Sequence, residues 1–199
     1  MQKDIIKERR FHFGETDKDI FTFKELENLL NLRPFVNTER FIITEKNSYS
    51  FQEYSWGTDV RSIPISIVKK IIQKDVAYLR DCGRLNKKIN NICKELETIF
   101  KQPADCHIYF SFKKNVKGFS KHRDNADNFI VLCEGSLKVE VWNEKKITKI
   151  MQPGEYVFIP EQIDHRITPL TDKRLSCSFP VQQTGKINLF DEREWLTLS

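Results

Sequence analysis

The 199-residue sequence contains no apolar run long enough to span a bilayer. Its first residues, "MQKDIIKERRFHFGETDKD", are too charged for a secretory signal, and their apolar runs are too short. It also has no CxxC pair, since its five cysteines are scattered, at Cys82, Cys93, Cys106, Cys133 and Cys177. These absences argue against a disulfide framework and a zinc knuckle, so we expect reduced, packed thiols in a cytoplasmic protein.

The chain has an excess of positive charge but no basic segment that stands out. The net charge is +5, from 33 Lys and Arg against 28 Asp and Glu, and the lysines are spread over predicted helices and turns. A positive protein can pair with nucleic acid, a ribosome or a carboxylate substrate, but dispersed lysines are typical of solvated faces. The sequence therefore indicates neither a nucleic-acid nor a membrane partner.

Residues 1–104 carry the patterns of a mostly helical region. In "TFKELENLL", Thr22 and Glu25 form a capping-box pattern before leucines at helical spacing. A second helix is predicted over residues 64–83, because its proline suits a first turn and its glycine suits the position after the last turn. A third helix follows over "NKKINNICKELETIF", with Asn86 as its cap.

Beyond residue 104 the apolar period changes to two, which is typical of strands. The runs are short and separated by turn residues, as a sandwich or small barrel requires. Two short strands in the first half, "RFIITE" and "YSFQEYSW", are expected to extend the same sheet. The second half is predicted to form seven strands in tight antiparallel hairpins, at residues 107–115, 128–135, 137–146, 147–154, 155–162, 165–170 and 174–182.

A histidine and an aspartate lie two residues apart in "KGFSKHRDNADNF". On an extended chain His122 and Asp124 point to the same face and can bind one ion together. His165, in "PGEYVFIPEQIDHRI", is the candidate third ligand from another strand. Two histidines and a carboxylate on one face of an octahedron leave three positions open and suit non-haem Fe(II). The alternative is a hydrogen-bonded turn at His122 and Asp124, with His165 packed under a loop.

These motifs resemble those of the cupins. In "GEYVFIPEQIDH" the pattern G-x5-P-x4-H is close to the second cupin motif, with Gln162 where a glycine is usual. "HRDNADNFIVLCEGSL" is similar to the first motif in its H-x-D form. That form resembles JmjC-type and cupin-like 2-oxoglutarate oxygenases, a group that contains ribosomal-protein and asparaginyl hydroxylases. The likeness covers roughly residues 105–180.

The resemblance implies a mainly β protein with α-helices. A double-stranded β-helix, or jelly-roll barrel, is expected over residues 105–199. The helical region 1–104 is expected to pack on one of its sheets, with both parts in one structural domain. The resemblance also implies Fe(II) and 2-oxoglutarate as cofactors, with His122, Asp124 and His165 as metal ligands and catalytic residues.

The resemblance further implies residues that bind the cosubstrate. In several of these hydroxylases an asparagine four residues past the aspartate lies beside the metal, and Asn128 stands at that position. A cation, usually with a hydroxyl, binds the distal carboxylate. JmjC-type relatives place this cation two residues past the glycine that matches Gly135, where this chain has Leu137. Lys138 follows, on the strand face expected to meet water unless a β-bulge turns it inward.

The anchor for the distal carboxylate is therefore open between several residues. We rank Tyr109 and Lys138 first, as hydroxyl and cation. Other residues can supply the same groups, namely Arg174, Arg166 or Lys113 as the cation and Ser176 as the hydroxyl.

The function that the resemblance favours is an Fe(II)- and 2-oxoglutarate-dependent dioxygenase that hydroxylates an amino-acid side chain, free or in a peptide or protein, or another small molecule. One alternative is a metal-dependent cupin of another class, such as a dioxygenase, lyase or isomerase without 2-oxoglutarate. Another is a ligand-binding barrel without turnover, which the lack of an effector domain weakens. Only 42 residues separate His122 from His165, which favours a small molecule or short peptide as substrate. Whether the protein forms a homodimer stays open.

Overall fold

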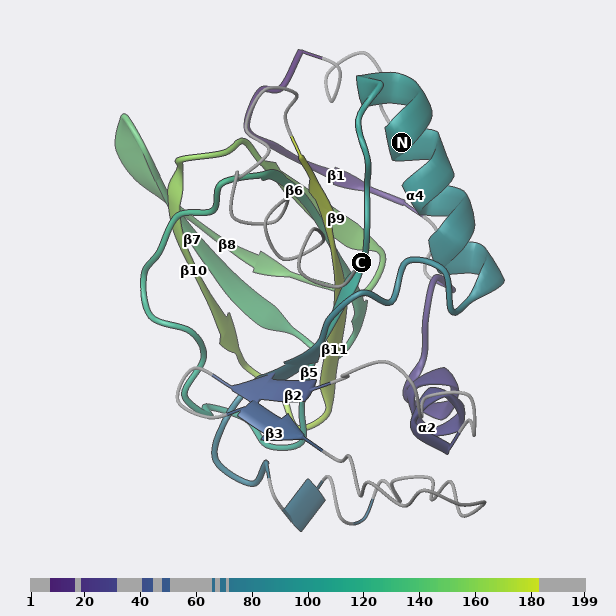
Figure 1. The fold of residues 1–199 in the computed structure, drawn as a ribbon. Coiled ribbons are helices and arrows are strands. Elements are labelled where there is room, and N and C mark those ends of the chain that lie inside the picture. Colours follow the sequence, from purple (N-terminus) through teal and green to yellow (C-terminus); the bar gives the residue numbers. More distant parts are fainter. Residues whose placement is uncertain are drawn as a thin grey trace, which may run out of the picture.

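The computed structural model describes residues 8–16, 19–31, 41–44, 48–50, 66, 69–70 and 72–182. In these residues the chain forms an eight-stranded sheet, in the order β1-β9-β6-β11-β5-β4-β2-β3, and a three-stranded sheet, in the order β10-β7-β8 (Figure 1). The strands are β1 (His12–Glu15), β2 (Phe41–Thr44), β3 (Ser48–Ser50), β4 (Ala77–Leu79), β5 (His107–Ser111), β6 (Asp127–Glu134), β7 (Leu137–Asn143), β8 (Lys145–Met151), β9 (Glu155–Ile159), β10 (Asp164–Pro169) and β11 (Arg174–Val181).

The seven strands predicted after residue 104 are all present, as β5 to β11, and neighbouring strands pair antiparallel. Gly135 makes the tight turn from β6 to β7 with a φ of +82°. A Cβ at this position would lie 2.6 Å from Oγ1 of Thr171 and 2.7 Å from the carbonyl oxygen of Lys173, so only glycine fits. The prediction of a mainly β jelly-roll fold is confirmed.

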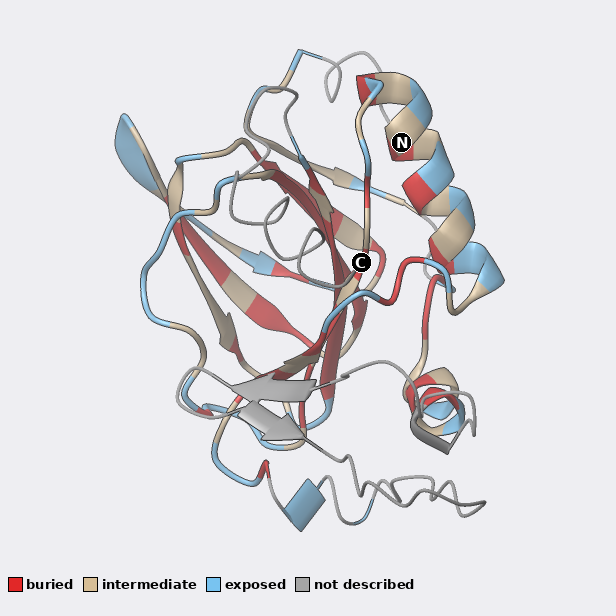
Figure 2. Ribbon diagram, in the orientation of Figure 1, coloured by how far each residue is buried: buried red, intermediate tan, exposed pale blue. Residues whose placement is uncertain are grey.

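The large sheet packs on both of its faces. On one face, Leu175 and Phe179 of β11 join a core that also contains the buried side of helix α4 (Lys87–Phe100). On the other face, Val157 and Ile159 of β9 pack against Val139 of β7, and these residues fill the barrel interior between the two sheets. Figure 2 shows the buried residues concentrated along the strands of both sheets and on one side of α4.

Two of the predicted helices form where the sequence placed them. Helix α2 (Phe23–Asn31) begins with the predicted capping box, in which the N–H of Glu25 donates to Oγ1 of Thr22 and the N–H of Thr22 donates to Oε2 of Glu25. Helix α4 begins after Asn86, whose side chain accepts hydrogen bonds from the next turn. No helix in the described part of the chain is long and apolar enough to cross a membrane.

The helix predicted over residues 64–83 is wrong in its second part. Residues Ala77–Leu79 form strand β4, which pairs antiparallel with both β2 and β5. Gly83 does not end a helix, because its N–H donates to Oδ1 of Asp105 at 2.8 Å. A Cβ on Gly83 would lie 2.5 Å from that same oxygen, which explains the glycine by close approach.

The division predicted at residue 104 does not coincide with a break in the sheet. Strands β1 and β4 both precede residue 104 and pair with β9 and β5, so the first half extends the large sheet as well as covering it. The strand predicted at residues 40–45 is β2, which pairs with β3. Most of the strand predicted at residues 49–56 lies outside the described residues.

Candidate metal centre

His122 and His165 face each other from two chain segments. His165 belongs to β10, whereas His122 lies on the irregular segment that leads into β6. The backbone N–H of each donates to the carbonyl of the other, at 3.1 and 2.8 Å, and the ring centroids are 4.4 Å apart. His165 therefore comes from a distant strand, as predicted, but His122 and Asp124 share an irregular segment rather than a strand.

Hydrogen bonds to the backbone fix which nitrogen of each ring is protonated. Nδ1 of His122 lies 2.7 Å from the carbonyl of Ser120, and Nδ1 of His165 lies 3.0 Å from the carbonyl of Ile163. Because a carbonyl only accepts, Nδ1 carries the proton in both rings and Nε2 keeps its lone pair. Burial lowers the pKa of His165, which favours the neutral ring that a metal ligand must have.

Asp124 completes the group. Its Oδ1 lies 3.8 Å from Nε2 of His122, and its Oδ2 lies 3.4 Å from Nε2 of His165. Ligand atoms at about 2.1 Å from one ion and at right angles to each other are about 3 Å apart. Movements of less than about 1 Å therefore bring these three side chains around a single ion.

Asn128 holds the Asp124 carboxylate in place. Its Nδ2 donates to Oδ2 of Asp124 at 2.6 Å, and its Oδ1 accepts from Oγ of Ser178 on β11 at 3.1 Å. This chain of hydrogen bonds connects the irregular segment to the large sheet. Asn128 thus lies beside the triad, where the sequence placed it, and its contact is with a ligand side chain.

Arg174 is buried in the barrel, and no carboxylate of the described residues pairs with it. It begins β11, and strand alternation puts it on the same face as Ser176 and Ser178, opposite the face packed on α4. Its side chain is 2% exposed, and its Nη1 donates to Oγ of Ser176 at 2.8 Å. Burial lowers the pKa of Arg174 to about 10, so it stays cationic at neutral pH.

Two buried polar atoms at this end of the barrel lack a hydrogen-bond partner among the described residues. One is Nε of the Arg174 guanidinium, and the other is Oγ of Ser111, the residue opposite Arg174 on β5. Tyr109 also belongs to β5 and lies opposite Ser176 of β11. It is close enough to Arg174 and Asp124 for both charges to act on its hydroxyl. Burial raises the pKa of Tyr109, so the hydroxyl is a donor at neutral pH. An orphaned cation and hydroxyls of this kind fit a carboxylate.

No protein-family model matches the chain. It is similar to the bifunctional lysine-specific demethylase and histidyl-hydroxylase NO66 of Dictyostelium discoideum, with 23% identity over 134 residues, which is 67% of this chain and 26% of that protein. NO66 of Branchiostoma floridae is 25% identical over 81 residues, 41% of this chain and 13% of that protein. The chain thus spans about a quarter or less of these curated relatives.

Solved structures with the same fold include the Escherichia coli ribosomal oxygenase YcfD, with a TM-score of 0.64 and 15% identity over 96% of this chain and 54% of that one. YcfD in complex with cobalt and 2-oxoglutarate matches with a TM-score of 0.58 and 16% identity over 98% of this chain and 55% of that one. The predicted resemblance to JmjC-type, cupin-like oxygenases is confirmed. The chain spans about half the length of these structures.

Lys138, one residue past the position expected for the cation, does not reach the barrel interior, so its ranking as the anchor is corrected. Its neighbours Leu137 and Val139 face inward, whereas Nζ of Lys138 lies 3.7 Å from Glu140 on the outer face of β7. The bulge that would have turned it inward is not there, because β7 pairs in regular register with β8 and β10. Arg166 also contacts Glu140 on that outer face, at 2.6 Å.

An aromatic wall, defined as Tyr78, His107, Tyr109 and Phe119, stands beside the triad of His122, Asp124 and His165. Tyr78 stacks on Tyr109 and on His107 at centroid distances of 4.8 and 5.7 Å. Phe119 packs edge-on against Tyr78 and lies 6.4 Å from the His122 ring. Asp124 acts electrostatically on Tyr78, His107 and Tyr109, so the wall borders the candidate metal position.

Sequence reasoning missed most of this wall. Tyr78 lay within the helix predicted over residues 64–83, and neither His107 nor Phe119 was among the candidate site residues. The available signals were the alternation in "HIYFS", which puts His107, Tyr109 and Ser111 on one face, and the aromatic Phe119 in an otherwise polar loop.

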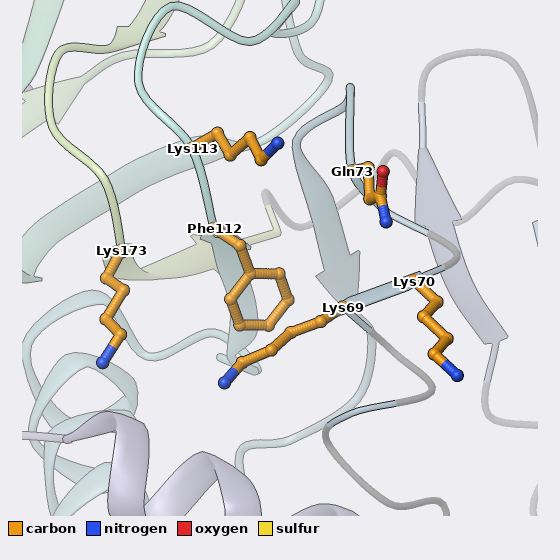
Figure 3. A pocket seen from close by; sticks show the side chains of 6 residues that line it. All are labelled: Lys69, Lys70, Gln73, Phe112, Lys113 and Lys173. Carbon is orange, nitrogen blue, oxygen red and sulfur yellow. The ribbon is translucent and has the colours of Figure 1, made fainter.

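Two other clusters lie apart from the triad. The carboxylates of Asp81 and Asp105 and the His107 ring lie within 4.8 Å of one another, but Oδ1 of Asp105 is used by the N–H groups of Gly83 and Cys106. A pocket of about 320 Å³ is lined by Lys69, Lys70, Gln73, Phe112, Lys113 and Lys173 (Figure 3). Lys113, a candidate cation from the sequence, therefore lines a surface pocket instead of the barrel interior.

Proposed function

We propose that this protein is an Fe(II)- and 2-oxoglutarate-dependent dioxygenase that hydroxylates an amino-acid side chain of a protein or peptide. The observation that carries the proposal is the presence of two features in one barrel. The ligand atoms of His122, Asp124 and His165 lie within 4.8 Å of one another, and the Arg174 guanidinium is buried without a carboxylate among the described residues. An uncompensated buried cation is costly unless a ligand neutralises it, so a metal site alone does not account for Arg174.

The triad would hold Fe(II) through Nε2 of His122, Nε2 of His165 and a carboxylate oxygen of Asp124. The Nδ1 hydrogen bonds of the two rings fix their orientation, and Asn128 fixes the carboxylate. Bound Fe(II) and 2-oxoglutarate supply the oxidising chemistry, in which O₂ is consumed, 2-oxoglutarate becomes succinate and CO₂, and a substrate C–H becomes C–OH. The protein's part is to position these groups and to exclude water.

The distal carboxylate of 2-oxoglutarate would bind Arg174, with the hydroxyls of Ser176, Ser111 and Tyr109 as further donors. Four residues of strand, about 13 Å, separate Arg174 from Ser178, which is hydrogen-bonded to Asn128 beside the triad. Tyr109 lies between the two ends, since both Arg174 and Asp124 act on it. This arrangement replaces the cation that JmjC-type relatives usually carry on the strand where this chain has Leu137.

The proposed substrate group is a side chain that packs on the aromatic wall. The wall gives a flat apolar surface beside the metal ligands, and a planar or aliphatic side chain can lie against it. The names of the relatives, a histidyl-hydroxylase and a ribosomal oxygenase, support a protein or peptide substrate over the free small molecule that the short barrel also favoured. They do so by analogy of fold, so the substrate has to be tested directly.

The test is succinate formation from 2-oxoglutarate with Fe(II) and ascorbate, measured on the purified protein. We expect slow substrate-independent turnover that is lost in Arg174→Met and kept in Arg10→Met, an exposed arginine outside the barrel. Arg174→Met should retain Fe(II) binding, because Arg174 contacts no ligand of the triad. A wild-type protein that binds Fe(II) but neither binds nor turns over 2-oxoglutarate would reject the proposal in favour of another class of metal cupin.

A further inference from the structure

The outer face of the small sheet gathers cations around one tryptophan. Side chains alternate along β7, so Trp142 and Glu140 point away from the interior that Val139 and Val141 fill. Trp142 pairs in register with Lys146 of β8 and with Asp164 of β10. We call this surface the Trp142 face, defined by Trp142 with Lys121, Arg123, Lys138, Lys146 and Arg166.

Three of these cations lie over the Trp142 ring. Nζ of Lys121 is 4.7 Å from the ring centroid, Nζ of Lys146 is 5.4 Å from it, and the guanidinium carbon of Arg166 is 5.9 Å from it. Their side chains remain 46%, 49% and 43% exposed, so the charges reach solvent. An aromatic ring within reach of several exposed cations is the combination that single-stranded nucleic acid uses, because bases stack and phosphates pair with the charges.

The carboxylates on this face do not neutralise it. Glu140 is shared by Lys146 at 2.7 Å, Arg166 at 2.6 Å and Lys138 at 3.7 Å. Asp164 is shared by Lys121 and Arg123, both at 2.9 Å. Five cations against two carboxylates leave three positive charges, and the exposed pair Glu144 and Lys145 at the tip of the hairpin cancel each other.

The face is continuous with the candidate metal centre. Lys121 and Arg123 flank His122 in the chain, and Asp164 precedes His165. A polymer lying on the face would therefore run past the metal ligands. The sequence pattern does not reveal this face, because the five cations are spread over residues 121–166. The antiparallel register of β7, β8 and β10 brings Lys138, Lys146 and Arg166 together, and the backbone pairing of His122 with His165 adds Lys121 and Arg123.

We infer that the Trp142 face binds single-stranded nucleic acid, with Trp142 stacking on a base and the surrounding lysines and arginines contacting the phosphates. The partner is defined by this chemistry, and RNA and DNA are its two sources. An acidic peptide supplies negative charge but no large planar group for Trp142, so it fits the face less well. The inference goes beyond the proposed oxygenase activity and does not depend on it.

The experiment is the binding of fluorescein-labelled dodecauridylate and dodecathymidylate to the full chain, without metal or 2-oxoglutarate, from 25 to 200 mM salt. Lys138→Gln with Lys146→Gln should weaken binding about tenfold at low salt and reduce the slope of log affinity against log salt by about 1.4, since each phosphate contact contributes about 0.7 for single strands. Lys87→Gln with Lys94→Gln, two exposed lysines of α4, is the matched control and should bind like the wild type.

A second readout tests stacking. Of the three tryptophans, Trp142 should be quenched by the unlabelled oligonucleotide, and Trp142→Phe should remove this quenching while circular dichroism stays that of the wild type. Tighter binding of the uridylate would make RNA the partner, and tighter binding of the thymidylate would make it DNA.

Three results would overturn the inference. The first is unchanged oligonucleotide binding in the Lys138 and Lys146 double variant. The second is loss of binding only when Lys113 and Lys173 of the lysine-lined pocket are changed to Gln. The third is binding of a twelve-residue polyglutamate as tight as that of the oligonucleotides. The last result would make the face a site for acidic peptides.

Discussion

The backbone N–H of Gln162 donates to the carbonyl oxygen of Asp124 at 2.9 Å. This bond ties the turn before His165 to the segment that carries the carboxylate ligand. Gln162 has a φ of +64°, the left-handed conformation that favours glycine, which explains why cupins usually carry glycine here. Its side chain adds a hydrogen bond of 2.7 Å from Nε2 to Oδ1 of Asn125. Gln162 therefore also stabilises the segment that carries Asp124 through its side chain.

Replacing Gln162 should separate backbone strain from side-chain contact. Gln162→Gly relieves a strain of about 1 kcal/mol and keeps the backbone bond, so its free energy of unfolding and its metal affinity should stay close to those of the wild type. Gln162→Val puts a β-branched side chain at positive φ and should lose both stability and metal affinity. Urea unfolding and metal titration check this, and equal values for the two variants would contradict it.

Asn128→Ala should weaken metal binding by a factor of about 10 to 100, because the Asp124 carboxylate loses the amide that orients it. From the sequence, Asn128 was expected to bind the cosubstrate and to leave iron binding largely unchanged when replaced; its hydrogen bond to Asp124 changes that expectation to a loss of metal affinity. Ser178→Ala, which removes only the hydroxyl that positions Asn128, should give a smaller loss of the same kind. Calorimetric metal titration measures both, and wild-type affinity in Asn128→Ala would show that the contact does not matter.

Ser111 and Ser176 should respond differently to removal of their hydroxyls. Oγ of Ser111 has no partner among the described residues, so Ser111→Ala should not lower the free energy of unfolding and should raise it by up to about 1 kcal/mol. Oγ of Ser176 accepts from Arg174, so Ser176→Ala should destabilise the protein. Both changes should weaken 2-oxoglutarate binding several-fold if the hydroxyls face its distal carboxylate. Unfolding without ligand and calorimetric titration with it separate the two effects, and wild-type 2-oxoglutarate affinity in both variants would move the anchor elsewhere.

Glu140 should make the protein sensitive to acid. Hydrogen bonds from Lys146 and then Arg166 lower the pKa of Glu140 from the ordinary 4.5 to about 2. A carboxyl whose folded pKa is depressed contributes stability above its unfolded pKa, and this contribution is lost as the pH falls from about 4.5 towards 2. The wild type should therefore exceed Glu140→Gln in unfolding free energy at pH 7, and the difference should shrink by pH 3. Urea unfolding at both values tests this, and a constant difference would count against the pKa shift.

Strand positions after residue 104 could be predicted because the runs alternate, as in β8, or are short apolar runs bounded by turn residues, as in β6 before Gly135. The helix predicted over residues 64–83 failed because a strand of three residues is too short for its alternation to stand out. Ala77 and Leu79 are buried and Tyr78 is partly exposed, but all three side chains are apolar or aromatic, so "VAYL" gives no period-two signal. Pairing with β2 and β5 decides its structure, and that pairing is a long-range contact.

The same limit applies to the candidate site. His122, Asp124 and His165 were identified from their spacing, whereas the proposed anchor required knowing which face of each strand turns inward. Alternation correctly placed Lys138 outside, but nothing local marks Arg174 as buried and unpaired with any carboxylate in the described part of the chain. That property depends on Ser111 from β5 and on the packing of the whole barrel end.

We expect His122, Asp124 and His165 to bind one metal ion that turnover requires. Iron content and succinate formation, measured with circular dichroism on Asp124→Ala, His165→Ala and the control His12→Ala, test it most directly. Both triad variants should keep the fold, because the barrel core is apolar and independent of the ion. They should bind iron far more weakly and form no succinate, whereas His12→Ala should bind iron and form succinate like the wild type. Full iron occupancy with normal succinate formation in either folded triad variant would contradict it.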